Sequence, residues 1–258
     1  MKVSLITISY NKEKEVGQTI ESVLKQDYTD IEYIIVDGGS NDGTLAIIER
    51  FKSSLNKFIS EPDNGIYHAI NKGIALATGE IIGLVHAGDM LFNNHVISEI
   101  VKCFTQTGAD IVYGNTMLVD PINTDRVVRV FEGGEFNTRR FLSGWMPSHS
   151  SVYIKKAVFQ KYGNYRLDLS IAADYELLLR FMYKNNVPST YYQGLVTRFR
   201  LGGISNKNVF SFIKSGSQCH RSWNLNNLKV PFYTIPLKIL RRIPDIIFRE
   251  RRLKKYFH

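Results

Sequence analysis

With 258 residues, of which 44% are hydrophobic and 22% charged, the chain has the composition of a globular protein with one large domain, or a domain plus an appendage. Its two cysteines argue against a disulfide framework and favour a reducing cytosol, and no apolar run approaches the ~20 residues that span a bilayer. We also expect no signal peptide. The net charge of +9 is concentrated in residues 228–258, where nine basic residues face two acidic ones, which leaves +2 for the body and argues against a nucleic-acid-binding protein.

The first part of the chain alternates short apolar runs with amphipathic segments. Strands are predicted over residues 3–9, 31–36, 57–60 and 80–85. Helices are predicted over 13–26, after the polar loop 37–44, and over 66–77. Strands that alternate with helices and are apolar on both faces indicate an α/β fold whose mainly parallel sheet is covered by helices on both faces.

The pattern becomes less regular beyond residue 110. The segments IVYG, VVRVF and HSSVYI predict shorter strands, 173–185 predicts a helix, and 190–200 predicts a closing strand. Residues 206–227 are polar and predicted to be helical, and they lead into the basic tail. We therefore expect one α/β domain over 1–205 and a helical, basic C-terminal extension over 206–258.

Polar residues follow three of the predicted strands. They are Ser9, Tyr10 and Asn11 after the first strand, Asp37 after the second, and His86 and Asp89 after the fourth. In an open α/β sheet, ligands bind beyond the carboxyl ends of the strands, so these side chains are expected at one edge. There, Asp37 can accept hydrogen bonds from a base or ribose, and Asp89 can hold a divalent cation beside a diphosphate.

Each of these residues also has a purely structural interpretation, which the residues alone leave open. Asp42 and Asp89 are possible caps of the helices that follow them. Asp174 lies where a helix begins, and a carboxylate there is favoured by the helix dipole. His149 fits an ordinary loop, and His68 and His86 fit satisfied polar residues as well as ligands.

An ordered series of motifs resembles the family 2 inverting glycosyltransferases of the type that builds bacterial polysaccharides. The series comprises ISYN (8–11), Gln26, IIVDGGSNDGT (34–44), SEPDNGIYHAINKGIALATGEIIGLVHAGD (60–89) and AADYELLLR (172–180). The resemblance covers residue 3 to about residue 205, where RLGGIS matches a common end of the catalytic core. It implies the GT-A fold, a Rossmann-like α/β architecture.

The resemblance also implies roles for individual residues. Ser9, Tyr10, Asn11 and Asp37 would hold the nucleotide, and Asn71 and Lys72 would lie near the sugar nucleotide. Asp89 matches the last position of the metal-binding DXD motif and would bind Mn²⁺ or Mg²⁺ across the diphosphate. Asp174 matches the acid that deprotonates the acceptor hydroxyl, and Trp145 and His149 fall where an acceptor loop is expected.

The sequence departs from the family pattern at several of these positions. Gly38 stands where a second acid often follows Asp37, which leaves the base of the nucleotide open. Ala87 stands at the first DXD position, so Asp89 is the remaining carboxylate, and Ala173 precedes Asp174 where Glu is frequent. His68 and His86 replace the usual Asp and Asn, without an explanation from the sequence.

The implied activity is the metal-dependent, inverting transfer of a sugar from a nucleotide-diphosphate sugar to a saccharide or lipid-linked acceptor. Such a transfer is one displacement at the anomeric carbon, with Asp174 as general base and a cation on the leaving diphosphate. UDP sugars are the family's commonest donors, and guanosine or thymidine donors stay open. Two alternatives remain: a sugar-nucleotide-binding module without turnover, and a nucleotidyltransferase.

The tail over 228–258 alternates apolar groups with Lys and Arg, and three prolines divide it into short segments. It is too charged to span a bilayer, but this pattern suits the surface of an anionic inner leaflet. We therefore expect a cytoplasmic enzyme, peripheral on the inner face of the plasma membrane, with no nucleic-acid partner. Packing of the same apolar groups against the domain is the alternative.

Overall fold

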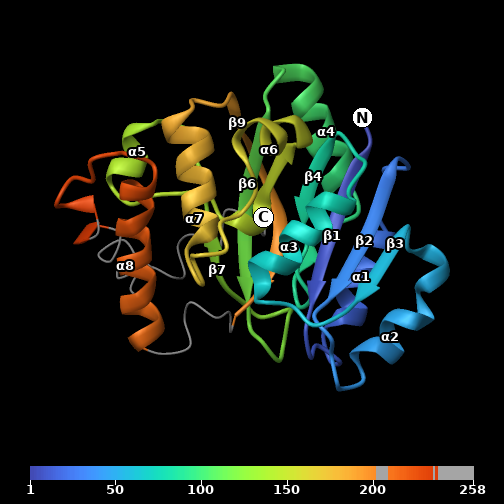
Figure 1. Ribbon diagram of the computed structural model, residues 1–258. Helices are drawn as coiled ribbons and strands as arrows, with labels where there is room; N and C mark the ends of the chain where they lie inside the picture. Colours follow the sequence, from blue (N-terminus) through green and yellow to red (C-terminus); the bar gives the residue numbers. More distant parts are fainter. Residues whose placement is uncertain (202–208, 235, 238–258) are drawn as a thin grey trace.

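A computed structural model describes residues 1–201, 209–234, 236 and 237 (Figure 1). The strands are β1 (Val3–Ser9), β2 (Ile31–Asp37), β3 (Lys57–Ser60), β4 (Ile81–Leu84), β5 (Met90–Leu91), β6 (Ile111–Val119), β7 (Val127–Phe131), β8 (Val152–Lys155) and β9 (Ser189–Arg200). The α-helices are α1 (Val16–Leu24), α2 (Thr44–Arg50), α3 (Ile66–Leu76), α4 (Val96–Thr107), α5 (Arg139–Leu142), α6 (Lys156–Tyr162), α7 (Ala173–Leu178) and α8 (Val209–Leu225). Short 3₁₀ turns lie at η1 (Lys52–Ser54) and η2 (His149–Ser151), and a π-helical turn, η3 (Leu179–Lys184), extends α7.

Nine strands of the described residues form a single sheet in the order β3-β2-β1-β4-β8-β6-β9-β5, with β7 paired to β6. The first four strands of the chain pair in parallel, and so do β6 and β9. The strands β8, β7 and β5 join antiparallel to their neighbours. The predicted α/β class is thus confirmed, with a parallel first half and a mixed second half.

Two hydrophobic cores cover the two faces of this sheet. In β1, Val3 and Leu5 point into the core shared with α1, α2 and α4, whereas Ile6 and Ile8 point into the core shared with α3, α6 and α7. The alternation follows from the pleat of a strand, which sends successive side chains to opposite faces. Figure 1 shows α3 and α6 in front of the sheet. The prediction of helices on both faces is confirmed.

Helix α8 packs against α7, although it follows the boundary predicted at residue 205. Its Cys219 and Trp223 belong to the same buried core as α3 and α7. Beyond α8, Thr234 is buried and its Oγ1 donates a hydrogen bond to the Leu142 carbonyl, 2.6 Å away. The division into two domains stays a prediction, and residues 238–258 of the predicted tail lie outside the described residues.

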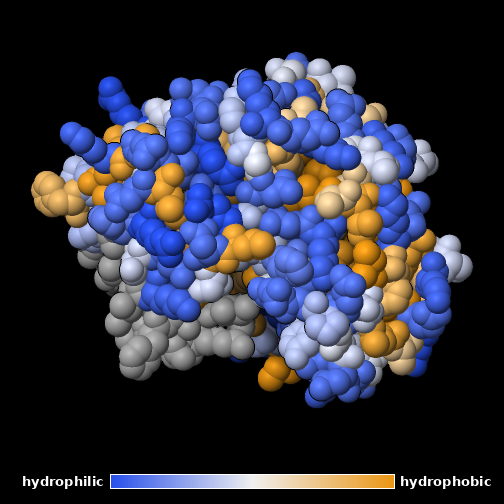
Figure 2. Space-filling model, viewed as in Figure 1, coloured by the Kyte–Doolittle hydropathy of each residue, from blue (hydrophilic) through white to orange (hydrophobic). Residues whose placement is uncertain are grey.

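The face of the molecule seen in Figure 2 is largely hydrophilic, with hydrophobic patches between the polar areas. No helix among them combines the length and the apolar character that a membrane span requires. Where the chain leaves α8, Phe232 is 91% exposed, in contrast to the neighbouring buried Thr234.

Candidate active site

The carboxyl ends of β1, β2 and β3 bring Ser9, Asp37 and Ser60 into one row. Strand register pairs Ser9 with Asp37 and Asp37 with Ser60. Asp37 is fully buried, and its Oδ2 accepts hydrogen bonds from the Gly39 and Ser40 amides and from Ser60 Oγ, at 2.8–3.0 Å. Its Oδ1 accepts a further bond from Ser40 Oγ at 2.5 Å. Asp37 therefore holds the shape of the loop that follows it.

The loop after β1 is tied to the loop after β2. The Asn11 amide donates to Ser40 Oγ at 2.8 Å, and Asn11 Oδ1 accepts from the Asn41 amide at 3.0 Å. Asn11 has a φ of 50°, in the left-handed region that Asn tolerates better than most residues. The neighbouring Tyr10, directly after β1, is 60% exposed.

A tight turn follows β4 and places Asp89 at the same edge. The Asp89 amide donates to the His86 carbonyl at 2.8 Å, and Gly88 has a φ of 109°, a conformation that favours glycine. Thr19 of α1 holds this turn, because its Oγ1 donates to the Asp89 carbonyl and accepts from the Gly88 amide. The turn His86–Asp89 is thus held by a hydrogen bond within its own backbone and by the side chain of Thr19.

The Asp89 carboxyl is suited to supply one ligand to a divalent cation. It is 5% exposed, and its Oδ1 accepts a 3.3 Å bond from the Arg200 amide. Burial raises its pKa to about 7, against the opposing effects of that bond and of the charges on Lys12 and Arg200. A cation would favour the ionised form, and diphosphate oxygens would supply its further ligands. Within the described chain, no cluster of three His, Cys, Asp or Glu side chains gathers for a metal.

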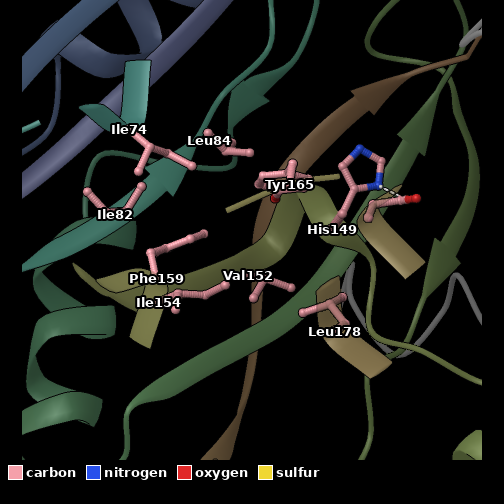
Figure 3. A pocket seen from close by; sticks show the side chains of 10 residues that line it. Ile74, Ile82, Leu84, His149, Val152, Ile154, Phe159, Tyr165 and Leu178 are labelled. Atoms are coloured by element: carbon pink, nitrogen blue, oxygen red, sulfur yellow. Dashed lines mark ion pairs between the residues drawn. The ribbon is translucent and has the colours of Figure 1, made fainter. Parts of the chain in front are cut away.

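Asp174 lies in the first turn of α7 and contacts residues from two other elements. His149 Nδ1 lies 3.3 Å from its Oδ2 (dashed line in Figure 3). Tyr67 of α3 lies 3.4 Å from its Oδ1 and donates a shorter bond, 2.7 Å, to the Ile171 carbonyl. The Asp174 side chain is 21% exposed, so one of its faces remains reachable from outside.

Asp174 and His149 line a pocket whose remaining walls are apolar apart from Tyr165 (Figure 3). Those walls are formed by Ile74, Ile82, Leu84, Val152, Ile154, Phe159, Tyr165 and Leu178. On its other side, the His149 ring lies 5.9 Å from the His86 ring, centroid to centroid. His149 therefore connects the turn that carries Asp89 with the helix that carries Asp174.

His86 is a neutral imidazole in this arrangement. Its Nδ1 is buried without a hydrogen-bond partner among the described residues. Burial, and secondarily the nearby His149, hold the pKa of His86 well below its usual range. The sequence left His86 unexplained, and the structure places it as the neighbour of His149.

The segment before α7 is fixed by α8. Gln218 Oε1 accepts hydrogen bonds from the Ile171 and Ala172 amides at 2.9 and 3.2 Å. Arg221 donates to Asp168 Oδ2 at 2.9 Å on the same segment. Two residues of the predicted extension thus position the start of the helix that carries Asp174.

Of the two residues expected near the sugar nucleotide, Asn71 forms its hydrogen bonds with the backbone of another segment of this chain. Its side chain donates to the Tyr165 carbonyl and accepts from the Tyr165 amide, at 2.8 and 3.1 Å. Lys72 Nζ pairs with Glu61 at 2.6 Å and with Asp63 at 2.7 Å. Their contact with a sugar nucleotide stays a prediction.

Trp145, expected in an acceptor loop, lies in the aromatic core. It is 5% exposed, packs edge-on against Tyr113 and Phe141, and has the Arg140 guanidinium 4.1 Å from its ring centroid. A direct contact between Trp145 and an acceptor stays a prediction, whereas His149 already lies at the pocket beside Asp174.

Three residues at this site were not singled out from the sequence. Tyr67 is adjacent to the apolar stripe of its helix, Arg200 ends the last strand, and Asp63 sits in EPDNG, which indicated only a turn. A local signal was available for Asp63: it precedes His68 and Lys72 by five and nine residues, and both contact its Oδ1 in the structure.

Comparison with known proteins decides the family. The sequence profile of Glycosyl transferase family 2 matches residues 4–163, more than half of the chain. The chain belongs to this family. An uncharacterized glycosyltransferase of Mycobacterium tuberculosis is 35% identical over 184 residues, 69% of this chain and 68% of the relative. The PGL/p-HBAD biosynthesis glycosyltransferase of Mycobacterium bovis is 26% identical, over 79% of this chain and 78% of the relative.

Solved structures show the same fold. Staphylococcus aureus TarS superposes with a TM-score of 0.69 and 19% identity, over 98% of this chain and 45% of the TarS chain. The chain therefore spans less than half the length of that protein. The mannosyltransferase PcManGT of Pyrobaculum calidifontis superposes with a TM-score of 0.64 and 17% identity, over 93% of this chain and 68% of its own. These neighbours are GT-A glycosyltransferases, and the predicted GT-A fold is confirmed.

Proposed function

We propose that this family 2 glycosyltransferase transfers a sugar, with inversion and with a divalent cation, from a nucleotide-diphosphate sugar to a hydroxyl acceptor. The observation that carries the proposal is the position of His149. It lies 3.3 Å from the Asp174 carboxylate, and its ring lies 5.9 Å from that of His86, at the start of the Asp89 turn. A general base and a cation-binding carboxyl at one sheet edge are what a single displacement needs.

Asp174 is the general base in this proposal. Its side chain is 21% exposed, so an acceptor hydroxyl can approach the carboxylate from outside and transfer its proton to it. The contacts with His149 and Tyr67 orient the carboxylate. A positioned base of this kind contributes roughly 10²–10⁴-fold to the rate.

Asp89 is the residue that would hold Mn²⁺ or Mg²⁺, together with the donor diphosphate. Such a cation, when bound, stabilises the negative charge that develops on the leaving nucleotide diphosphate. The chain itself contributes the buried carboxyl and the turn held by Thr19, which keeps the Asp89 backbone in place.

The donor is proposed to be a UDP sugar, and the acceptor a saccharide or a lipid-linked molecule of cell-surface polysaccharide synthesis. TarS has been crystallised in complex with UDP-GlcNAc, and PcManGT in complex with GDP-Man and Mn²⁺. These complexes support a nucleotide-sugar donor for this fold.

A screen of nucleotide sugars tests the proposal. The full chain would be incubated with UDP, GDP and dTDP sugars in the presence of Mn²⁺ or of EDTA, and donor hydrolysis and melting temperature would be measured. Turnover of one nucleotide class with Mn²⁺ supports the transferase. Thermal stabilisation without any turnover would favour the alternative of a binding module, and a response to free nucleotide triphosphates alone would favour a nucleotidyltransferase.

The proposed location is the cytoplasmic face of the plasma membrane, reached through the basic tail. Liposome co-sedimentation tests it, with the full chain and with a chain that ends at Leu237. That end point retains the buried Thr234 and its bond to Leu142. The full chain should bind anionic vesicles at low salt, and the shortened chain should not; equal binding by both would contradict the tail's role.

A further inference from the structure

One oxygen of the Asp63 carboxylate, close to the loop that follows β2, is buried and has no hydrogen-bond partner among the described residues. The Asp63 side chain is 7% exposed, and its Oδ1 contacts His68 Nδ1 at 2.9 Å and Lys72 Nζ at 2.7 Å. The other oxygen, Oδ2, is the one without a partner among the described residues. An unsatisfied buried acceptor costs free energy, which a ligand that donates a hydrogen bond would recover.

Asp63 is held against the loop that follows β2. The Glu61 amide donates to the Asp37 carbonyl at 3.0 Å, and Pro62 lies 3.2 Å from the Cβ position of Gly39. The two contacts on Oδ1 fix the direction in which Oδ2 points. Asp63 is thus oriented by His68 and Lys72, which gives these two residues a role.

Oδ2 faces the space left by a glycine. A Cβ atom at Gly38 would lie 3.5 Å from Asp63 Oδ2 and 3.4 Å from Cδ2 of the Tyr10 ring. The Tyr10 ring, 60% exposed, therefore borders the same space as the unpaired oxygen. Because Oδ2 is buried, a ligand reaches it only when a neighbouring side chain moves, and an exposed ring can rotate without disturbing a core.

The chemistry of this space fits a planar ring with one N–H at its edge. Uracil and thymine carry a single ring N–H between two carbonyl groups, which matches a single free carboxylate oxygen. Guanine presents two neighbouring donors and would require both oxygens, but Oδ1 is already occupied by His68 and Lys72. Cytosine and adenine carry no ring N–H at this edge and would offer only a hydrogen of their amino group.

We propose that Asp63 selects the nucleobase of the donor: its Oδ2 accepts the ring N–H of uracil or thymine, and the Tyr10 ring packs against the base. This inference rests on the proposed function, since it assumes a nucleotide-sugar donor. It assigns the specificity of that donor to a residue outside the segments that follow β1 and β2.

The wild-type chain alone provides a first test. Isothermal titration calorimetry with Mn²⁺ would compare UDP, N3-methyl-UDP, GDP and CDP. UDP should bind about 10–100-fold more tightly than N3-methyl-UDP, because the methyl group removes one charge-assisted hydrogen bond. Equal affinities for UDP and N3-methyl-UDP, or tighter binding of GDP, would overturn the inference. Binding of none of the four nucleotides would overturn the proposed function together with it.

Variants then assign the effect to Asp63. In Asp63→Ala, UDP should bind 10–100-fold more weakly, and UDP and N3-methyl-UDP should differ by less than about threefold. Glu61→Ala is the matched control: it removes the other carboxylate on Lys72 and should keep the wild-type discrimination. Continued discrimination by Asp63→Ala would contradict the assignment.

A second substitution tests whether Asp63 recognises the base directly or only supports its loop. The Cβ position at Gly38 has only ordinary van der Waals contacts, so Gly38→Asp can place a carboxylate in the same space. Combined with Asp63→Ala, it should restore the preference for UDP over N3-methyl-UDP. Gly38→Asp alone should weaken UDP binding, because its carboxylate and that of Asp63 would then lie in the same space. Absence of rescue, in a double variant that melts like wild type, would overturn the proposed recognition.

Discussion

Trp223 of α8 donates a hydrogen bond from Nε1 to the Tyr175 hydroxyl of α7, over 3.0 Å, and both side chains are almost completely buried. Helix α8 lies beyond the domain predicted over residues 1–205, and α7 carries Asp174. The bond therefore joins the predicted C-terminal extension to the helix that carries Asp174. Around it, Tyr183 packs on Trp223 with ring centroids 5.0 Å apart.

We predict that Tyr175→Phe lowers the free energy of unfolding by about 1–3 kcal/mol, because it leaves the buried Trp223 Nε1 without this acceptor. Urea denaturation followed by tryptophan fluorescence measures the change. Tyr183→Phe is the control, since it retains the ring that packs on Trp223 and should change stability much less. Equal losses in the two variants would show that the hydroxyl of Tyr175 has no special role.

Asp174→Asn should lower kcat by at least ~10²-fold while donor affinity changes little, because the amide keeps the shape of the side chain but cannot accept a proton. Steady-state kinetics and donor titration measure the two quantities separately. Asp110→Asn, at a carboxylate that pairs with Lys155 away from the segment before α7, should leave kcat near the wild-type value. An unchanged kcat in Asp174→Asn would refute the role of general base.

Asp89→Ala should abolish metal-dependent donor binding and turnover, and leave the fold nearly intact, because little core volume is lost. Calorimetric titration of the donor with Mn²⁺ and with EDTA measures the metal-dependent part, and a melting curve reports on the fold. Asp89→Asn, which retains an acceptor for the Arg200 amide, separates charge from shape and should show the same loss. Full activity of either variant at saturating donor would contradict the assignment.

Glu32 should contribute stability that is lost in acid. Burial acts to raise its pKa, but hydrogen bonds from Ser4 and Thr78 and the contact with Lys57 outweigh burial and lower the pKa to about 2. A lowered pKa means that the contribution is complete above pH 4.5 and disappears as pH falls toward 2. Glu32→Gln should therefore reduce the free energy of unfolding by roughly 2–3 kcal/mol at pH 7.

The same comparison at several pH values checks the sign of the Glu32 effect. The difference between wild type and Glu32→Gln should be largest above pH 4.5 and should vanish near pH 2. Glu49→Gln, at an exposed ion pair with Lys52, should have almost no effect at any pH. A difference that stays constant with pH would point to lost hydrogen bonding rather than to lost charge.

The sequence predicted the first half of the fold closely, because each strand there is a continuous apolar run with a turn at its end. The strands predicted over 3–9 and 57–60 have the bounds of β1 and β3. Helix α4 was not predicted, although Val96, Ile100 and Phe104 repeat at helical spacing and are buried. The insertion of β8 between β4 and β6 depends on contacts between distant segments, which no local pattern contains.

The site was predicted in part for the same reason. Residues at or just beyond the ends of strands, such as Asp37 at the end of β2 and Asp89 in the turn after β4, could be placed at one edge from topology alone. The pairing of His149 with Asp174 joins positions 25 residues apart and requires the folded chain. Asp63 was missed because its neighbours Pro62 and Asn64 are typical of turns, and the nearby His68 and Lys72 were not recognised as its partners.

The two hydrogen bonds that Gln218 Oε1 accepts from the segment before α7 have a consequence for how such enzymes diversify. Helix α8 supports the segment before Asp174, the proposed general base, and also leads toward the basic tail, so we expect changes in the C-terminal segment and in the site to be coupled. An exchange of C-terminal segments between relatives would carry the support of Asp174 with it. We expect hybrid enzymes joined before α8 to lose turnover even when donor affinity is inherited intact, whereas hybrids joined beyond Thr234 should keep both.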